Sequence, residues 1–367
     1  MCGRQFRSLC AGLLVLTTCW IVQAEDAPQP KGLKRSLVVS GQGYFPVALR
    51  LKDDRIAVVL RGGAGHLGIK GRLDMVFSAD EGQTWSKPVV VNDSPVDDRN
   101  PAFGQAANGD LVVGFWRTAT YDDNGRYNPK LDKPRNTWVT RSSDDGKTWS
   151  KAAELDVTDI GWGSPFGKML TLPDGTMLMA IYGGPVQSDG TKTTKRVDHS
   201  YVYRSTDHGK TWCRSAECSS KIQLNETSLL LLPSGKLLAA MRARAGGIWL
   251  SESSDGGKSW SEPARITPAN VHPADLALLP DGRVLMTTGY RVGPFGVRGL
   301  ISDANGAFDW NRRFLLVNDG IGGDCGYPSS VILKNGRVLT LYYANGVKDN
   351  RAWRGHCGAL IYTPPTD

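Results

Sequence analysis

Six segments of the chain place charged or reactive side chains directly in front of an apolar run. They include carboxylates, tyrosines and a histidine, which can act as acid, base or nucleophile when they converge. Polar groups in such positions are costly to bury unless they are used or paired, so these segments are the first candidates for a site. Their polar side chains are Tyr44, Asp98, Arg99, Ser164, Asn225, Glu226, His272, Asp275, Asp324 and Tyr327.

The same segments carry the signal of a β-hairpin. In each, a short apolar strand leads to a turn rich in Asp, Asn and Gly, and a second apolar strand follows. This order predicts a hairpin, and the chain repeats it six times. The repeats begin at Tyr44, Arg99, Gly163, Asn225, Val271 and Gly326.

A second repeat, Ser-x-Asp-x-Gly-x-Thr/Ser-Trp, follows most of the hairpins and is called the box below. The Asp side chain can accept hydrogen bonds from backbone N–H groups farther along the turn, and the Gly can adopt a positive φ. The Trp can bury a large ring beneath the turn. We therefore interpret the box as a structural element. Intact copies are Ser78–Trp85, Ser142–Trp149, Ser205–Trp212 and Ser253–Trp260, and a decayed copy is Ser302–Trp310.

Six hairpins with almost no helical periodicity predict an all-β, six-bladed β-propeller with about four strands in each blade. A closed ring removes exposed strand edges. We expect Ser36–Ser40 to complete the last blade beside Ala359–Tyr362. The innermost strands of a propeller line its axis, so the six strand starts converge at one end of the channel. The polar loops Trp116–Trp138 and Gly183–Ser200 are expected on a rim.

The N-terminus has the pattern of a secretion signal. Basic residues precede an apolar stretch from Leu9 to Val22, and Ala24 ends a small-residue cleavage pattern. We expect residues 1–24 to be a signal peptide and residues 25–367 to form one propeller domain of a secreted or periplasmic protein. A lipoprotein anchor at Cys19 is the weaker alternative. No other segment has the length and apolarity of a membrane span.

The charge of the chain limits the class of partner, and its cysteines indicate possible disulfides. The formal net charge is +8, and Lys and Arg are dispersed along the chain. No basic run resembles a nucleic-acid patch, so we expect no nucleic-acid partner, and a mild positive field suits an anionic substrate. An exported protein can form disulfides, and the candidate pairs are Cys213–Cys218 and Cys325–Cys357.

Together with the boxes, two stretches resemble the sialidase (neuraminidase) superfamily of glycoside hydrolases. The stretch from Asn225 to Arg242 is similar to the family segment with a catalytic Glu and a carboxylate-binding Arg. Gly326–Tyr343 is similar to the segment with a tyrosine nucleophile. The resemblance implies these roles: nucleophile for Tyr327, base for Glu226, and carboxylate binding for Arg242 and Arg298.

A tyrosine nucleophile suits a sugar that itself carries a carboxylate. Sialic acid bears one at its anomeric carbon, and this group would repel an anionic carboxylate nucleophile. A neutral phenol activated by a neighbouring Glu avoids the repulsion, provided that the two groups lie within hydrogen-bond reach. Arginines can bind the substrate carboxylate through two parallel hydrogen bonds.

Two positions differ from the family pattern. The first strand start reads Tyr44-Phe45-Pro46 where the family has Arg-Ile-Pro, so one expected arginine is missing. A glycine-rich loop holds His66 where the family has an acid/base Asp. A histidine can act as an acid or base near neutral pH. Further candidates are Tyr44, Arg61 and Asp275 as substrate contacts, and Asp275 and Asp324 as alternative acids.

The sequence thus predicts an exo-glycoside hydrolase that removes a terminal sialic acid or a related acidic sugar from a glycan. Two alternatives stay open: another glycosidase or a lyase that uses His66 with Tyr327, and a non-catalytic propeller that binds a glycan or a protein. The five histidines are scattered without the paired spacing of metal ligands. We therefore expect neither a catalytic metal nor a cofactor.

Overall fold

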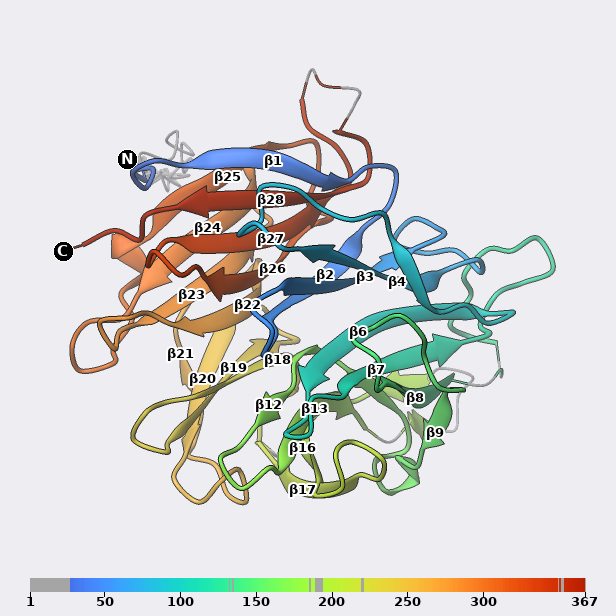
Figure 1. Ribbon diagram of the computed structural model, residues 1–367. Coiled ribbons are helices and arrows are strands. Elements are labelled where there is room, and N and C mark those ends of the chain that lie inside the picture. Colours follow the sequence, from blue (N-terminus) through green and yellow to red (C-terminus); the bar gives the residue numbers. More distant parts are fainter. Residues whose placement is uncertain are drawn as a thin grey trace, which may run out of the picture.

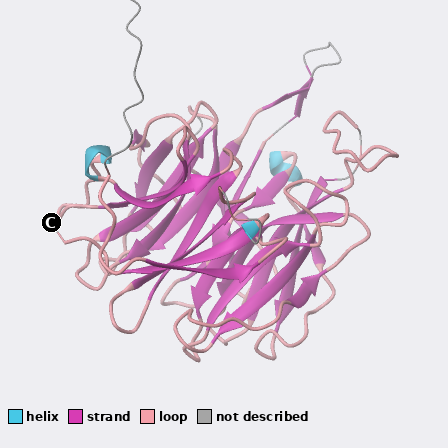
Figure 2. Cartoon of the chain, turned by 90° about the horizontal axis from the view of Figure 1, so that it is seen from above, coloured by secondary structure: helices cyan, strands magenta, loops and turns pink. Residues whose placement is uncertain are grey.

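The computed structural model describes residues 27–366, apart from residues 132, 134, 185, 189–193, 219, 220, 349, 351 and 352. The described chain forms a ring of six β-sheet blades (Figures 1 and 2), which confirms the predicted six-bladed propeller. The expected signal peptide lies outside the described residues. Among the described residues, no helix is both long and apolar enough to cross a membrane. The short helices of this part are η1 (Thr158–Ile160) and η2 (Trp310–Arg312).

In the first, second, fourth and fifth blades, four antiparallel strands follow one another outward from the axis in chain order. The first is β2 (Tyr44–Arg50), β3 (Ile56–Gly62), β4 (Arg72–Ser78) and β5 (Val89–Asn92). The second is β6 (Asp97–Gln105), β7 (Leu111–Thr118), β8 (Arg135–Ser142) and β9 (Ala153–Leu155). The fourth is β18 (Leu224–Leu231), β19 (Leu237–Ala243), β20 (Ile248–Ser253) and β21 (Ala264–Arg265). The fifth is β22 (Val271–Leu278), β23 (Val284–Tyr290), β24 (Phe295–Ile301) and β25 (Phe314–Gly320).

The sixth blade closes the ring with strands from both ends of the described chain. The predicted pairing is confirmed, because Ser36 lies opposite Ala359. The strand from the N-terminal side thus forms the outer edge of a sheet built from the C-terminal part (Figure 1). The strands of this blade are β26 (Cys325–Ile332), β27 (Val338–Ala344), β28 (His356–Tyr362) and β1 (Lys34–Val39).

The third blade is irregular, because its inner strand is broken. The first piece, β10 (Gly163–Pro165), and the last, β12 (Leu170–Thr171), pair with β13 (Met177–Gly183). The middle piece, β11 (Gly167–Lys168), pairs in parallel with β6 of the second blade. The remaining strands of this region are β16 (His199–Ser205), β17 (Cys213–Glu217) and the separate hairpin β14 (Val186–Ser188) and β15 (Thr194–Arg196).

The core lies between neighbouring blades, which explains the continuous apolar runs of the inner strands. Every residue of β3 and β27 is buried, since both faces of each strand are covered. One core cluster joins Val47 and Val59 of the first blade to Phe103 and Val113 of the second. Each blade is therefore held chiefly by apolar contact with its neighbours.

The boxes form turns at the outer hairpins, and hydrogen bonds among their own residues hold these turns. In the second blade, Oδ1 of Asp144 accepts hydrogen bonds from the Ser142 hydroxyl at 2.8 Å and the Thr148 N–H at 2.9 Å. Gly146 has a φ of 84°, and Trp149 packs on the core cluster shared by the first and second blades. The interpretation of the box as a structural element agrees with this geometry.

Neither expected disulfide forms, and all four cysteines of the described chain are free. Cys325 and Cys357 lie on β26 and β28, with β27 between them. Two strand spacings, about 10 Å, exceed the reach of a disulfide. Cys213 and Cys218 lie at opposite ends of an extended segment, about 16 Å long at the usual rise of a strand. The Cys213–Cys218 prediction was wrong because two cysteines that are close in sequence stay far apart when the segment between them is extended.

A buried ion pair crosses the axis. The Lys168 ammonium donates to Asp275 Oδ2 at 2.7 Å and to the Ser330 carbonyl at 2.7 Å. The Ser330 N–H in turn donates to the same Asp275 oxygen at 2.7 Å. These residues belong to the third, fifth and sixth blades, so the contact ties together blades on different sides of the channel. Burial, opposed by Lys168, raises the pKa of Asp275.

Candidate functional site

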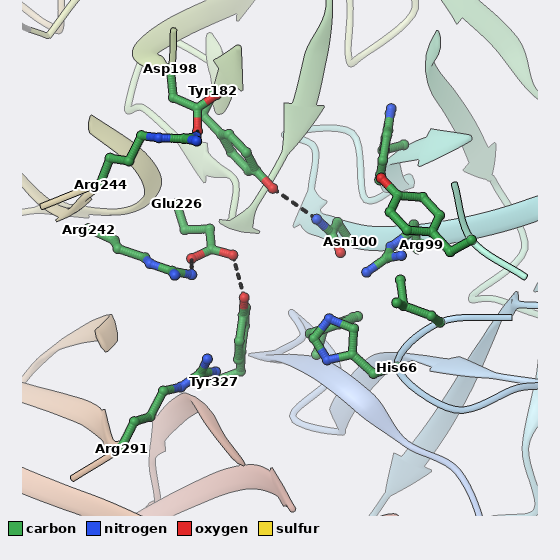
Figure 3. Close-up of a pocket in the computed structure, with 14 residues that line it drawn as sticks. His66, Arg99, Asn100, Tyr182, Asp198, Glu226, Arg242, Arg244, Arg291 and Tyr327 are labelled. Atoms are coloured by element: carbon green, nitrogen blue, oxygen red, sulfur yellow. Dashed lines mark hydrogen bonds and ion pairs between the residues drawn. The ribbon is translucent and has the colours of Figure 1, made fainter. Parts of the chain in front are cut away.

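The strand starts meet around a cavity of about 350 Å³ at one end of the channel. Its volume lies within the usual range for small-molecule sites. Side chains from all six blades line it (Figure 3). The strand starts contribute in the first, second, fourth and sixth blades, whereas the third and fifth blades contribute residues from other segments. The polar lining includes His66, Arg99, Asn100, Tyr127, Tyr182, Asp198, Glu226, Arg242, Arg244, Arg291 and Tyr327.

A local distortion turns the strand starts toward this cavity. The inner strands β2, β6, β18, β22 and β26 each shift register within their first residues, as a β-bulge does. Phe45, Asn100 and Tyr327 have positive φ angles of 54°, 51° and 47°. Such angles are unfavourable for residues with a side chain and are typical of functional sites.

Tyr327 and Glu226 point toward each other and are in direct contact at the cavity wall (Figure 3). The Tyr327 hydroxyl donates a hydrogen bond to Oε1 of Glu226, and Arg242 donates to Oε2 at 2.8 Å. Tyr327 and Glu226 are 6% and 5% exposed, so their contact is shielded from bulk water. The three side chains thus form a chain from arginine to carboxylate to phenol.

The surroundings keep Glu226 ionised and Tyr327 neutral. Burial would raise the pKa of Glu226, but the charge of Arg242 and the hydrogen bond from Tyr327 outweigh it and bring the pKa below its ordinary value. Burial, and then the neighbouring Glu226 charge, raise the pKa of Tyr327 well above that of a free phenol. At neutral pH the carboxylate is therefore the proton acceptor and the phenol is the donor.

Arg291, just beyond β23, supplies a second cation beside Tyr327. Its guanidinium lies 5.2 Å from the centre of the Tyr327 ring, and its Nε donates to the Cys325 carbonyl at 3.2 Å. Its Nη2 is buried without a hydrogen-bond partner. The effect of the two arginines is seen at His272, at the start of β22. Burial, together with the positive charges of Arg242 and Arg291, lowers the pKa of His272 to about 3. This wall of the cavity therefore favours an anion.

His66 lines the cavity from the loop between β3 and β4. Its Nδ1 lies 2.7 Å from Oδ1 of Asp324, and its ring packs against Phe45 with centroids 5.0 Å apart. Phe45 also packs against Tyr327, with centroids 4.9 Å apart. The imidazole and the phenol thus flank one aromatic ring on the cavity floor.

The wall formed by the second and third blades is polar and aromatic. Asn100 donates to the Tyr182 hydroxyl at 3.0 Å, and its Oδ1 is buried without a partner. The Arg99 guanidinium lies 5.8 Å from the Phe45 ring and 5.5 Å from the Trp116 ring. Asn100 and Arg99 lie across the cavity from Arg242 (Figure 3).

Four sequence candidates for substrate contact do not line the cavity. Arg298 is fully buried and donates to the carbonyls of Val317 and Pro294, so the expectation that it binds substrate is wrong. Asp275 is occupied by Lys168 deeper in the channel. The other two candidates support the site from behind.

Arg61 and Tyr44 are those two supporting residues. Arg61 is fully buried, pairs with Asp97 at 2.6 Å, and donates to the Gly68 carbonyl at 3.0 Å, so it shapes the loop that carries His66. The Tyr44 hydroxyl donates to Asn345 at 2.9 Å. Neither side chain lines the cavity, which corrects the expected direct contact with substrate.

Several lining residues share one position, and Tyr182 and Arg291 among them were not predicted from the sequence. Trp116, Tyr182, Arg242 and Arg291 each lie at or just past the end of the second strand of a blade. That strand runs antiparallel to the first, so its end reaches the rim at which the first strand starts. Examining strand ends as well as strand starts would have identified Tyr182 and Arg291.

Comparisons with known proteins agree with this architecture. The family model described as BNR repeat-like domain matches residues 75–340. A sialidase of Paraclostridium sordellii is 28% identical over 155 residues, which are 37% of this chain and 36% of that protein. A sialidase of Bacteroides fragilis is 26% identical over 225 residues, which are 54% of this chain and 39% of that protein. The matches thus span well under half of either relative.

Solved structures share the fold at low sequence identity. A protein of unknown function from Dyadobacter fermentans has a TM-score of 0.76 at 23% identity, covering 90% of this chain and 99% of that one. An intramolecular trans-sialidase from Ruminococcus gnavus has a TM-score of 0.65 at 13% identity, covering 89% and 95%. At these identities the likeness concerns the fold alone.

Proposed function

This chain belongs to the BNR repeat-like family within the sialidase superfamily, and from that premise we propose that it is a glycoside hydrolase. Its substrate is a glycan that ends in sialic acid or a related acidic sugar. The similarity to two sialidases and the cationic wall of Arg242 and Arg291 support this choice. We include secretion in the proposal, on the N-terminal pattern of residues 1–24.

The hydrogen bond from Tyr327 to Glu226 carries the proposal. The phenolic oxygen attacks the anomeric carbon while its proton passes to Glu226, and the glycosidic C–O bond breaks. The leaving oxygen takes a proton from His66, which lines the same cavity. Water then attacks the anomeric carbon, His66 accepts the water proton, and Glu226 returns its proton to the departing Tyr327 oxygen.

Arginines on the Tyr327 side orient the substrate in this proposal. Arg242 is engaged with Glu226 through Nη1 and has a buried Nε without a partner. Arg291 has a buried Nη2 without a partner. These donors suit the two oxygens of a substrate carboxylate, and Arg291 takes the role expected of Arg298.

The test is hydrolysis of a 4-methylumbelliferyl sialoside by the wild-type protein and by Tyr327→Phe. The wild type is expected to turn over, and loss of the nucleophile lowers kcat/KM by at least about 10³-fold. Tyr342→Phe is the matched control, since Tyr342 is a buried tyrosine of the same blade outside the cavity. Equal loss in both variants, or full activity of Tyr327→Phe, would contradict the nucleophile. A wild type inactive on every sialoside would contradict the substrate.

One observation favours a second candidate, a glycosidase for another acidic sugar or a lyase. Where the family pattern has an arginine, Tyr44 directs its hydroxyl to Asn345, and Phe45 lines the cavity instead. The residues that would bind an anomeric carboxylate therefore carry less positive charge near Tyr44 and Phe45. A panel of aryl glycosides of uronic acids distinguishes a new sugar. An unsaturated, ultraviolet-absorbing product from a uronate polysaccharide would identify a lyase.

A further inference from the structure

Asp324, which the mechanism above leaves without a role, lies directly behind His66. One carboxylate oxygen is 2.7 Å from Nδ1 of His66. Asp324 immediately precedes β26, the strand that carries Tyr327. One strand start thus places both the proposed nucleophile and a carboxylate that contacts the proposed acid/base.

A set of donors surrounds this carboxylate. The Tyr343 hydroxyl donates to Oδ1, and the Asn345 amide donates to Oδ2 at 2.7 Å. The Tyr44 hydroxyl donates to the other end of the Asn345 amide at 2.9 Å, which orients its NH₂ group toward Asp324. The network fixes the carboxylate from the side opposite the cavity.

The donors keep Asp324 ionised. Burial raises its pKa, but the hydrogen bond and charge of His66, followed by the bonds from Tyr343 and Asn345, lower the pKa to about 2. At neutral pH Asp324 therefore cannot serve as the acid itself. An ionised carboxylate only accepts hydrogen bonds, so Nδ1 of His66 must carry a proton. Nε2 is then the ring atom available for proton exchange.

We infer that Asp324 is the positioning residue that holds His66 in the Nδ1–H tautomer, leaving Nε2 to exchange protons in the cavity. The inference rests on the proposed function. Protonated Nε2 gives its proton to the glycosidic oxygen as the C–O bond breaks, and the neutral nitrogen later takes a proton from the attacking water. Asp324 stays ionised throughout and faces the imidazolium whenever it is present. A His–Asp pair thus stands where the family pattern has a single Asp.

The first experiment needs no substrate. Imidazole ¹⁵N shifts of the full-length protein report the tautomer of His66, with His66→Gln providing the assignment. We expect a protonated Nδ1 in the wild type and a shift toward the other tautomer in Asp324→Asn. A wild-type His66 protonated at Nε2 and bare at Nδ1 would overturn the inference. This result is independent of whether the protein hydrolyses sialosides, and it stands even if Asp324→Asn fails to fold.

The second experiment compares aryl sialosides whose leaving phenols differ in acidity. A poor leaving group needs the proton and a good one does not, so Asp324→Asn should lose about 10²–10⁴-fold in kcat on the least acidic phenol and little on the most acidic. Asp324→Glu, which keeps the carboxylate, should recover part of the loss. Asp319→Asn is the control, because this carboxylate pairs with Arg35 outside the cavity. An equal loss across the whole series would overturn the positioning role.

Discussion

Arg291 and Arg298 lie near each other in sequence but in opposite environments. Arg298 lies within β24 and is enclosed by backbone carbonyls, whereas Arg291 follows the end of β23 and reaches the cavity. The family resemblance favoured Arg298 as the residue that binds the substrate carboxylate. The position of a residue within its strand, however, determines where its side chain points. The functional difference between the two can be measured.

We expect Arg291→Met to raise KM for the aryl sialoside by about 10–100-fold, because a charged hydrogen bond to the substrate is lost. Its melting temperature should fall less than that of Arg298→Met, because Arg291 donates to one backbone carbonyl and Arg298 to three. Arg298→Met should instead lower the free energy of unfolding by about 2–4 kcal/mol, because buried carbonyls lose their donor, with KM unchanged in the folded fraction. Steady-state kinetics and thermal melts separate the two outcomes. The reverse pattern would return the substrate role to Arg298.

Glu226 and Tyr327 were predicted as site residues because they lie at strand starts, and the family resemblance added Arg242 and His66. The sequence could not separate Arg61 from these. Arg61 ends its strand in the same way, but Asp97 of the next blade draws its guanidinium away from the cavity. Contacts of this kind between blades leave no pattern within either strand.

At the scale of elements, the box can be tested through the acid dependence of its Asp. Hydrogen bonds from the Thr148 side chain and backbone, and then from Ser142, lower the pKa of Asp144 to about 2. A lowered pKa means that the ionised carboxylate stabilises the fold above about pH 4 and that this contribution is lost as the pH falls through about 2. The box should therefore matter most near neutral pH.

Asp144→Ala should lower the melting temperature at pH 7 by about 2–4 °C. The difference from the wild type should shrink as the pH approaches 2. Differential scanning calorimetry across this range provides the measurement, with Asp123→Ala, an exposed loop residue, as the control. A difference that is constant with pH would show that the carboxylate is not the stabilising group.

Most strands could be predicted because their apolar runs are bounded by Asx and Gly turns. The broken inner strand of the third blade could not. Its middle piece pairs with β6 of another blade, and the sequence Gly-Ser-Pro-Phe-Gly resembles the other strand starts. The β-bulges were also missed, since a bulge depends on the register between two strands.

At the scale of the whole molecule, Lys168 and Asp275 connect blades across the channel. Lys168→Met leaves a buried carboxylate without its cation and should cost about 3–5 kcal/mol in the free energy of unfolding. The double variant Lys168→Met/Asp275→Leu should recover much of this cost, because no charge remains to be buried. Urea unfolding of the single and double variants gives the coupling energy.

The pH dependence of the single variant provides a further check. Burial already raises the pKa of Asp275, and removing Lys168 removes the main opposing charge. The folded variant should therefore bind a proton that the unfolded chain releases, so its stability should increase as the pH falls. Stability of Lys168→Met that is equal at pH 5 and pH 8 would contradict this account.

The mouth of the propeller is built from strand starts and strand ends that different blades contribute. Because the scaffold beneath most of these places is a similar hairpin, a new side chain can be installed there without redesigning the core. Substrate preference in such a ring can change through single substitutions on separate blades, each compensating for another. Tyr44, where the family pattern has an arginine, and His66, where it has an aspartate, are two such differences on the same six-bladed frame.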